Sequence, residues 1–306
     1  MPDTAKYDKL SKALGKGQIR ACIVMRGAEI EFEYYRNKKA ETSLHHINSC
    51  SKSITALLLG ICLKQGLIRD INVPIKEFFG DYPAISDGSG KDAITIYHLL
   101  TMTPGLDWRE FGEWNYFSPM EYSADIVSFI LNRDMEFRPG EKMNYSSGCS
   151  HLLGAIIQTV SGKKLIDFAH EHLFAPLGIK DIVWHEKQGV NLGANGLKMT
   201  PADMLKLGSL CLQRGNWNGE QLVPQEWIIE STKPHFQTYP EIGAYGYHWW
   251  VSNVGQSNYY FAMGLFGQFI IVVPDFDTVV VFTSENYGET MQPMRYFRDI
   301  ILPLIG

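Results

Sequence analysis

A Ser-x-x-Lys tetrad at the head of a long apolar run is the feature that most limits how this chain can fold. Ser49-Cys50-Ser51-Lys52 precedes residues 53–64, in which Ile, Leu, Ala and Gly dominate. The run is compatible with a helix, and residues three apart share one helix face, so Ser49 and Lys52 are expected together on the first turn. A helix N-terminus adds a positive dipole and free N–H groups. A hydroxyl placed there can be activated without histidine, beside donors that can hold an oxyanion.

The same tetrad has a simpler interpretation, in which Ser49 is an ordinary N-cap and Lys52 an exposed helix lysine. Roughly one Ser-x-x-Lys match is expected by chance in a chain this long. A second match does occur, at Ser161-Gly162-Lys163-Lys164. It follows a helix-compatible stretch and carries glycine directly after the serine, which predicts a helix-end turn.

Composition places the chain among ordinary globular proteins and excludes several classes. The chain has 306 residues, 45% of them hydrophobic and 20% charged, with a net charge of −5. This charge predicts no nucleic-acid partner. Residues 1–16 are expected to form a short amphipathic helix without the apolar segment of a secretory signal. No stretch approaches the roughly 18 apolar residues of a membrane span, so no membrane partner is expected.

Cysteine and histidine spacing predicts neither a disulfide framework nor a metal site. The five cysteines are scattered and form no Cys-x-x-Cys pair, which favours reduced thiols in a cytoplasmic protein. The close histidine pairs are His45-His46 and His170-Glu171-His172. Neither has the His-Glu-x-x-His spacing of a zinc site, so surface or capping roles are expected and no cofactor is predicted.

Strand-like runs lie at both ends of the chain, and helix-like blocks lie between them. Strands are expected at 19–25, 29–35, 247–251, 259–262, 268–273 and 278–283, with a tight hairpin at 274–277. Helices are expected near 95–102, 124–132, 147–160, 165–172, 201–214 and 291–305. This order predicts an α/β fold of the α+β type, in which both chain ends build one antiparallel sheet flanked by helices. Residues 1–68 and 224–306 are assigned to this sheet lobe and 69–223 to a mainly helical lobe, as one catalytic domain with its site between the lobes.

Two further segments carry residues suited to acyl-transfer chemistry. Tyr145 lies in a loop that leads into the predicted helix at 147–160; it is either a semi-buried tyrosine beside an N-cap at Ser146 or Ser147, or a phenol facing Lys52. In the second case Lys52 is expected to lower the pKa of Tyr145 from about 10, so that the pair exchanges a proton with Ser49. The second segment, Ala262-Met263-Gly264-Leu265-Phe266-Gly267, lies at a strand edge. Its glycines permit close approach to a ligand, with the amides of Ser49 and Leu265 as an oxyanion hole, or mark a β-bulge without chemistry.

Together these segments resemble the serine β-lactamase and penicillin-binding superfamily, above all its class C β-lactamase-like branch. That branch includes DD-peptidases, D-amino-acid amidases, family VIII esterases and 6-aminohexanoate-dimer hydrolases. The resemblance extends over nearly the whole chain. It rests on the order Ser-x-x-Lys, Tyr-x-Ser and a glycine-containing strand, and on residues 94–106, Phe137-Arg138-Pro139-Gly140, residues 196–204 and residues 245–250.

The resemblance implies a β-lactamase/transpeptidase-like fold with Ser49 as the acylated nucleophile, Lys52 as its partner and Tyr145 as the general base. Ser147 falls where β-lactamases and peptidases commonly carry asparagine, and it is expected to bind either Lys52 or a substrate amide. Ala262 falls at the place of the family's Lys or His, next to Met263 and Gly264. Loss of that cation removes a charge-assisted contact worth roughly 1.5–3 kcal/mol to a substrate carboxylate, which favours an uncharged substrate or a carboxylate bound elsewhere.

Aromatic residues cluster in two regions around the expected groove: Trp108, Phe111, Trp114, Tyr116 and Phe117, and then Tyr245, Tyr247, Trp249 and Trp250. Most are expected in the core, because aromatic side chains dominate core burial. Trp114, Tyr116 and Phe117 lie in a polar loop and are the expected substrate-facing wall or lid.

The predicted function is hydrolysis of a small ester or amide through a Ser49 acyl-enzyme. Two alternatives remain open at this stage. One is an amidase for D-amino-acid or aminohexanoate-type amides, with weak β-lactam hydrolysis as a further possibility. The other is a penicillin-binding receptor or DD-peptidase-like protein that is acylated and turns over slowly. The predicted partner is a small-molecule substrate, and the sequence leaves the oligomeric state open.

Overall fold

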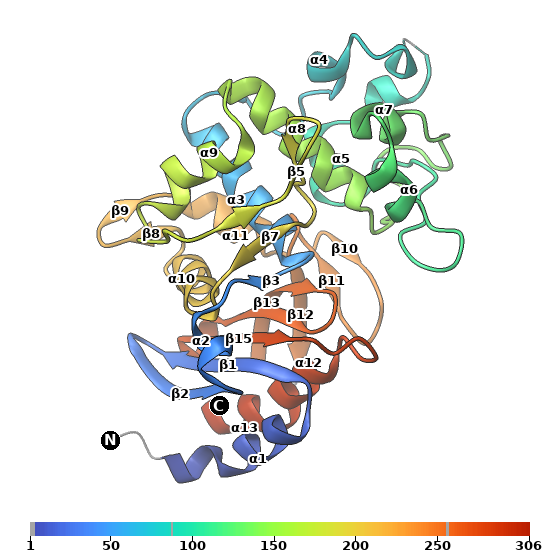
Figure 1. The fold of residues 1–306 in the computed structure, drawn as a ribbon. Coiled ribbons are helices and arrows are strands. Elements are labelled where there is room, and N and C mark those ends of the chain that lie inside the picture. Colours follow the sequence, from blue (N-terminus) through green and yellow to red (C-terminus); the bar gives the residue numbers. More distant parts are fainter. Residues whose placement is uncertain (1–3, 87, 255–256) are drawn as a thin grey trace.

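An eight-stranded antiparallel sheet built from both ends of the chain organises the molecule (Figure 1). The computed structural model describes residues 4–86, 88–254 and 257–306. In sheet order the strands are β10 (Phe236–Gln237), β11 (Ala244–Tyr245), β12 (Trp250–Val254), β13 (Ser257–Gly264), β14 (Gln268–Val273), β15 (Thr278–Ser284), β1 (Ile19–Arg26) and β2 (Glu29–Tyr35). β1 pairs with β15 from Ile19 to Arg26, so strands from the two ends of the chain lie side by side within the sheet. The predicted fold class is confirmed.

Helices cover the sheet on both faces. Figure 1 shows α1 and the C-terminal helices on one side of the sheet, and α3 and α10 on the other. The bounds are η1 (Thr4–Tyr7), α1 (Asp8–Lys16), α3 (Cys50–Lys64), α10 (Pro201–Leu212), α11 (Gln225–Ser231), η5 (Pro274–Phe276), α12 (Gln292–Tyr296), η6 (Phe297–Ile301) and α13 (Leu302–Ile305). α3 is buried along nearly its whole length, so its apolar sequence is that of a helix enclosed by protein on all sides. Its first residues are thereby held rigidly against the sheet.

The remaining helices and short strands form the second part of the molecule and the connections. They are α2 (Lys38–Thr42), β3 (His45–His46), α4 (Lys76–Phe79), η2 (Pro83–Ile85), η3 (Lys91–Ala93), α5 (Ile96–Leu100), α6 (Phe117–Tyr122), α7 (Ile126–Leu131), α8 (Ser147–Ser161), α9 (Leu165–Ala169), η4 (His170–Phe174), β4 (Val183–Trp184), β5 (Glu186–Lys187), β6 (Val190–Asn191), β7 (Leu197–Met199), β8 (Asn216–Trp217) and β9 (Glu220–Gln221). α8 packs against α3, and this contact brings the two halves of the site together. No helix in the described ranges is long and apolar enough to cross a bilayer.

Most predicted elements form where the residue pattern places them. The strand expected at 247–251 begins only at Trp250, because His248 has a φ of 60° and hydrogen-bonds toward the helical part of the molecule. The predicted boundaries of the two lobes stay a prediction. Helix α10, which belongs to the segment assigned to the helical lobe, packs directly on β14, β15 and β1.

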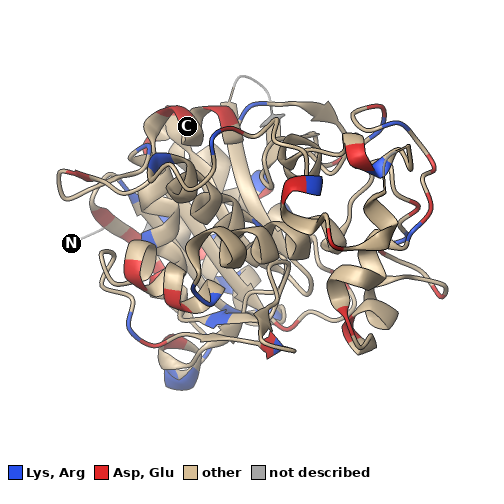
Figure 2. Ribbon diagram, turned by 90° about the horizontal axis from the view of Figure 1, so that it is seen from above, with Lys and Arg blue, Asp and Glu red and all other residues tan. Residues whose placement is uncertain are grey.

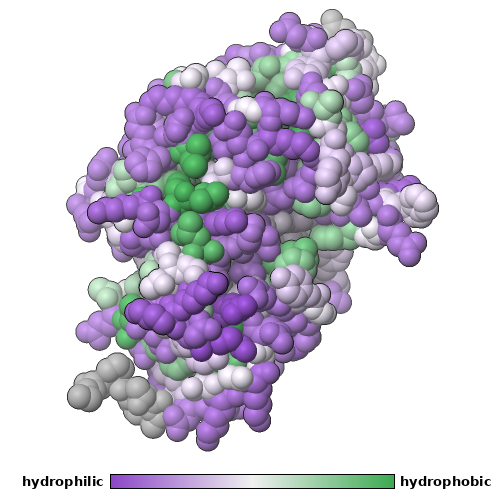
Figure 3. Space-filling view, in the orientation of Figure 1, coloured by the Kyte–Doolittle hydropathy of each residue, from purple (hydrophilic) through white to green (hydrophobic). Residues whose placement is uncertain are grey.

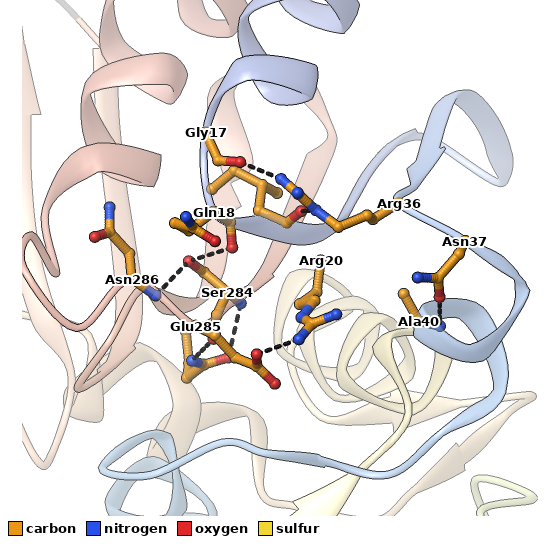
Figure 4. Close-up of polar contacts among 11 residues, drawn as sticks. Gly17, Gln18, Arg20, Arg36, Asn37, Ala40, Ser284, Glu285 and Asn286 are labelled. Atoms are coloured by element: carbon orange, nitrogen blue, oxygen red, sulfur yellow. Dashed lines mark hydrogen bonds and ion pairs between the residues drawn. The ribbon is translucent and has the colours of Figure 1, made fainter.

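Polar contacts fasten the start of β1 to the end of β15 (Figure 4). Ser284 donates from its hydroxyl to the Gln18 carbonyl at 3.1 Å and accepts from the Asn286 amide at 3.2 Å. Arg20 pairs with Glu285 beside them. Figure 2 shows Lys and Arg scattered among Asp and Glu over the ribbon, and the face shown in Figure 3 is mostly hydrophilic with small hydrophobic patches.

Candidate active site

Ser49 is presented at the start of α3 by a tight local turn. Asn48 adopts a φ of 49°, and the Ser51 hydroxyl donates to the Asn48 carbonyl at 2.7 Å. Gly264 at the end of β13 lies so close to the segment before Ser49 that an added Cβ would be 2.2 Å from the Ile47 carbonyl oxygen. The Asn48 side-chain amide donates to the Leu265 carbonyl at 2.7 Å. The turn that carries Ser49 is therefore clamped to the loop after β13.

Lys52 is a buried cation at the centre of the site. Its side chain is 1% exposed, so the alternative of an exposed helix lysine is wrong. Nζ lies 3.0 Å from Ser49 Oγ, 3.0 Å from Ser147 Oγ and 3.2 Å from the Ala194 carbonyl oxygen. Of the two roles left open for Ser147, the structure shows the contact with Lys52, and Ser147 is fully buried.

Burial shifts the charge state of Lys52 toward the neutral amine. Desolvation is the dominant cause and lowers the pKa of Lys52 to about 8, while the nearby Glu110 carboxylate raises it. Cys50, Cys149 and Glu121 contribute smaller effects in the same direction as Glu110. The ammonium is still the main form at pH 7, but the neutral amine that a general base requires is far more accessible than in an exposed lysine.

Tyr145 completes the group around the serine. It hydrogen-bonds Ser49, and its ring centre is 5.1 Å from Lys52 Nζ. The ring is held between Phe111 and Trp250, with centroid distances of 6.0 and 5.6 Å and interplanar angles of 10° and 21°. The tyrosine is 7% exposed, and this stacking fixes its hydroxyl next to the nucleophile.

The expected lowering of the Tyr145 pKa is wrong. Burial raises the pKa of the phenol well above its usual value, and the Glu110 carboxylate raises it further. Desolvation penalises the phenolate, because the charge would leave water for an apolar aromatic enclosure. Tyr145 therefore keeps its proton in the resting site, and Lys52 is the group whose pKa suits a base.

Glu110 is a functional candidate that the sequence analysis missed. Its carboxylate accepts from the Ser147 hydroxyl at 2.5 Å, from the Ser147 amide at 2.8 Å and from the Trp108 indole N–H at 2.7 Å. It lies in an irregular loop with no motif around it, and its partners are distant in sequence. Only its closeness to the aromatic loop residues could have pointed to it.

The predicted oxyanion donors lie where the fold brings the two segments together. Leu265 follows β13 directly, and Asn48 holds its carbonyl. Within the described residues, neither the Ser49 amide nor the Leu265 amide has a protein acceptor. The β13–β14 ladder runs in unbroken register through Gly264, so the alternative of a β-bulge is wrong. Gly264 is required by close approach to the chain's own backbone at Ile47.

The other predicted substrate contacts are less uniform. Ala262 is 1% exposed and lies in the core, whereas Met263 beside it is partly exposed. Trp114 is 82% exposed, and Phe117 begins α6. The Tyr116 hydroxyl donates to Asp107 at 2.9 Å. Their roles toward substrate stay predictions; the contact that the structure shows between this loop and Tyr145 comes from Phe111.

Two buried histidines near Lys52, His151 and His248, are neutral. His248 lies 3.0 Å from the Leu100 carbonyl oxygen through Nδ1 and 2.9 Å from the Ser150 hydroxyl through Nε2. Burial lowers the pKa of His248 and of His151 to about 3. All five cysteines are free and buried. Across the described ranges, no group of three or more His, Cys, Asp or Glu side chains could hold a metal ion.

A cavity borders the segment before Ser49. It has a volume of about 440 Å³ and is lined by Arg20, Lys39, His46, Asn48 and Phe266 among others. Arg20 is paired with Glu285 there, and Lys39 is exposed.

The second Ser-x-x-Lys tetrad lies elsewhere: Gly162 ends α8 with a φ of 66°, as predicted, and the Ser161 hydroxyl donates to the Ile157 carbonyl at 2.6 Å.

Comparison with known proteins agrees with this geometry. The β-lactamase family profile matches residues 11–301. The 6-aminohexanoate-dimer hydrolase of Paenarthrobacter ureafaciens is 24% identical over 85% of this chain and 71% of its own length. Esterase EstB of Burkholderia gladioli is 28% identical over 46% of this chain and 38% of its own length, so the chain spans well under half of that relative.

Solved structures show the same fold. The octameric penicillin-binding protein homologue from Pyrococcus abyssi aligns with a TM-score of 0.77 at 19% identity, covering 99% of this chain and 78% of its own. EstCE1, a hydrolase with promiscuous acyltransferase activity, aligns with a TM-score of 0.79 at 17% identity, covering 99% and 98%. Fold and site together define a hydrolase of the serine β-lactamase and penicillin-binding class. The chain belongs to the β-lactamase family.

Proposed function

We propose that the protein hydrolyses a small ester or amide through an acyl-enzyme on Ser49, with Lys52 as the base. The observation that carries the proposal is the position of Lys52 Nζ, 3.0 Å from Ser49 Oγ in a buried setting that lowers its pKa to about 8. A base within hydrogen-bond reach and with a pKa near the working pH is what proton abstraction from a serine needs.

The proposed reaction follows from the contacts of each group. Ser49 Oγ bonds to the substrate carbonyl carbon while its proton passes to Lys52, and the amides of Ser49 and Leu265 hold the oxyanion. Collapse breaks the bond to the leaving group, which takes the proton of Tyr145, and the Lys52 ammonium restores that proton. Water then enters by the reverse sequence and releases the acid.

The pH dependence of kcat/KM tests the role of Lys52. Because the neutral amine is the active form, we expect kcat/KM to rise about tenfold per pH unit below the pKa of Lys52, near 8, and to level off above it. The measurement is initial rates with p-nitrophenyl butyrate between pH 5.5 and 9.5, after subtraction of spontaneous hydrolysis. A profile that is flat between pH 6 and 9 would contradict a lysine base.

The substrate class follows from the lack of a cation at Ala262. This residue is buried in the core, and its methyl group offers a carboxylate no charge-assisted contact. We expect the wild-type enzyme to turn over p-nitrophenyl acetate or butyrate with at least about tenfold higher kcat/KM than nitrocefin, since one lost contact of this kind is worth that factor or more. A preference for nitrocefin would show that a carboxylate is bound by other residues.

A second candidate substrate, an amide that carries a carboxylate, is favoured by the cavity of about 440 Å³ beside Asn48. Arg20 in the lining of this cavity is paired with Glu285, so the exposed Lys39 is the candidate partner for a carboxylate. The first relative described above is named as a 6-aminohexanoate-dimer hydrolase. Assays with D-amino-acid amides and with the 6-aminohexanoate dimer decide between the two candidates. A slow receptor would instead release one equivalent of nitrophenol and stop.

We also propose a cytoplasmic location, supported by the five free, buried cysteines.

A further inference from the structure

Glu110 holds the Ser147 hydroxyl in one orientation. The carboxylate can only accept hydrogen bonds, and its Oε1 lies 2.5 Å from Ser147 Oγ. The single hydroxyl proton of Ser147 must therefore point at Glu110. The lone pairs of Ser147 Oγ are then left for Lys52, 3.0 Å away.

This orientation decides where the lone pair of neutral Lys52 points. A neutral amine has two N–H groups and one lone pair, and Lys52 has contacts with the Ser49 hydroxyl, the Ser147 hydroxyl and the Ala194 carbonyl. The Ala194 carbonyl can only accept, and the Ser147 hydroxyl already donates its proton to Glu110. Both groups therefore accept an N–H of Lys52. The remaining contact, with Ser49, is the one that receives the lone pair.

We propose that Glu110 is a positioning residue that makes Ser147 an obligate acceptor and so directs the lone pair of Lys52 at the proton of Ser49. The proposal rests on the proposed function of Ser49 and Lys52. Glu110 itself touches neither the nucleophile nor, in this account, the substrate; it acts through Ser147.

Replacement of Glu110 by glutamine is expected to reverse the direction of the hydrogen bond with the Ser147 hydroxyl, with almost no change in side-chain shape. Oε2 of Glu110 receives two fixed N–H donors, from Ser147 and from Trp108, so a glutamine places its carbonyl oxygen there. Its NH2 group then faces Ser147 Oγ and donates to it. The Ser147 proton must turn to another acceptor, and the Lys52 lone pair is within reach, where it competes with the proton of Ser49.

The test is kcat for p-nitrophenyl butyrate at the high-pH plateau. We expect Glu110→Gln to lose roughly 100-fold or more, the usual share of a general base, and Glu110→Asp to retain more activity because it still only accepts. Ser147→Ala in the Glu110→Gln background removes the competing proton, so the double variant should regain about tenfold over Glu110→Gln. Recovery of this kind is not expected from a merely structural defect.

Glu121→Gln is the control for the loss of negative charge alone. Glu121 acts on Lys52 through its charge, and its carboxylate accepts a hydrogen bond from Asn195 at 2.7 Å and none from Ser147. Both Glu110→Gln and Glu121→Gln remove a negative charge that raises the pKa of Lys52, so both should move the acid limb of the pH profile to lower pH. The other groups that raise the pKa of Lys52, Cys50 and Cys149, are unchanged in both variants. Only Glu110→Gln should lose the plateau rate, and Glu113→Gln, at an exposed position of the same loop, should match wild type.

Two results overturn the proposal. One is a folded Glu110→Gln enzyme, judged by near-UV circular dichroism and thermal midpoint, whose plateau kcat equals that of wild type. The other is a double variant no faster than Glu110→Gln alone. Failure of the underlying function is separate, because it would appear as a wild-type protein that a fluorophosphonate does not label on Ser49.

Discussion

Replacement of Ser49 by alanine is expected to abolish hydrolysis and fluorophosphonate labelling together. Ser49 is the hydroxyl that lies 3.0 Å from the buried Lys52 amine and hydrogen-bonds Tyr145. Loss of the nucleophile leaves only the modest contribution of the oxyanion donors, so we expect a fall in kcat of at least about 10⁴-fold. The measurement combines ester hydrolysis with mass-spectrometric mapping of the labelled peptide.

Ser161→Ala is the matched control for that variant. Ser161 belongs to the other Ser-x-x-Lys tetrad, but its hydroxyl donates to the Ile157 carbonyl at a helix end. Activity and labelling should stay near the wild-type level. Undiminished labelling of Ser49→Ala, with the adduct on another serine, would refute the assignment of the nucleophile.

Lys52 and Tyr145 are expected to act as one unit. Lys52→Ala and Tyr145→Phe should each remove most of kcat, by roughly 10²–10⁴-fold, because the proton that leaves Ser49 and the proton that reaches the leaving group travel through both groups. The double variant should be little worse than the more damaged single variant. The measurement is a double-mutant cycle on kcat at the plateau of the pH profile.

Two checks keep the cycle interpretable. Tyr145→Phe retains the ring that stacks between Phe111 and Trp250, so its loss reports the hydroxyl and not the packing. Thermal unfolding of each variant shows whether the core around α3 is intact. Losses that multiply in the double variant would mean that the two residues serve independent steps.

Local spacing made the centre of the site predictable. Ser49 and Lys52 are three residues apart on one helix, and their contact follows from helix geometry. Tyr145 and Ser147 were identified through the order of motifs that the family shares. Strands β14 and β15 were equally predictable, because their continuous hydrophobic runs are bounded by turn residues.

What the sequence could not supply depends on contacts between distant segments. Glu110 reaches Ser147 across 37 residues from an irregular loop, and nothing in the loop's own pattern marks it. The raised pKa of Tyr145 depends on burial against Phe111 and Trp250, which lie far from it in sequence, whereas the charge of Lys52 alone predicts a lowered one. Gly264 was read as room for a ligand, while it is the chain's own backbone at Ile47 that fills the space.

Trapping the intermediate during turnover shows directly whether Ser49 carries the acyl group. Wild-type protein is mixed with p-nitrophenyl butyrate, quenched in acid after milliseconds to seconds, and digested for peptide mass spectrometry. We expect a butyryl group on the peptide that contains Ser49, present during steady release of nitrophenol and gone once substrate is exhausted. Continued turnover with no acyl group on Ser49, or with the group on another residue, would contradict this expectation.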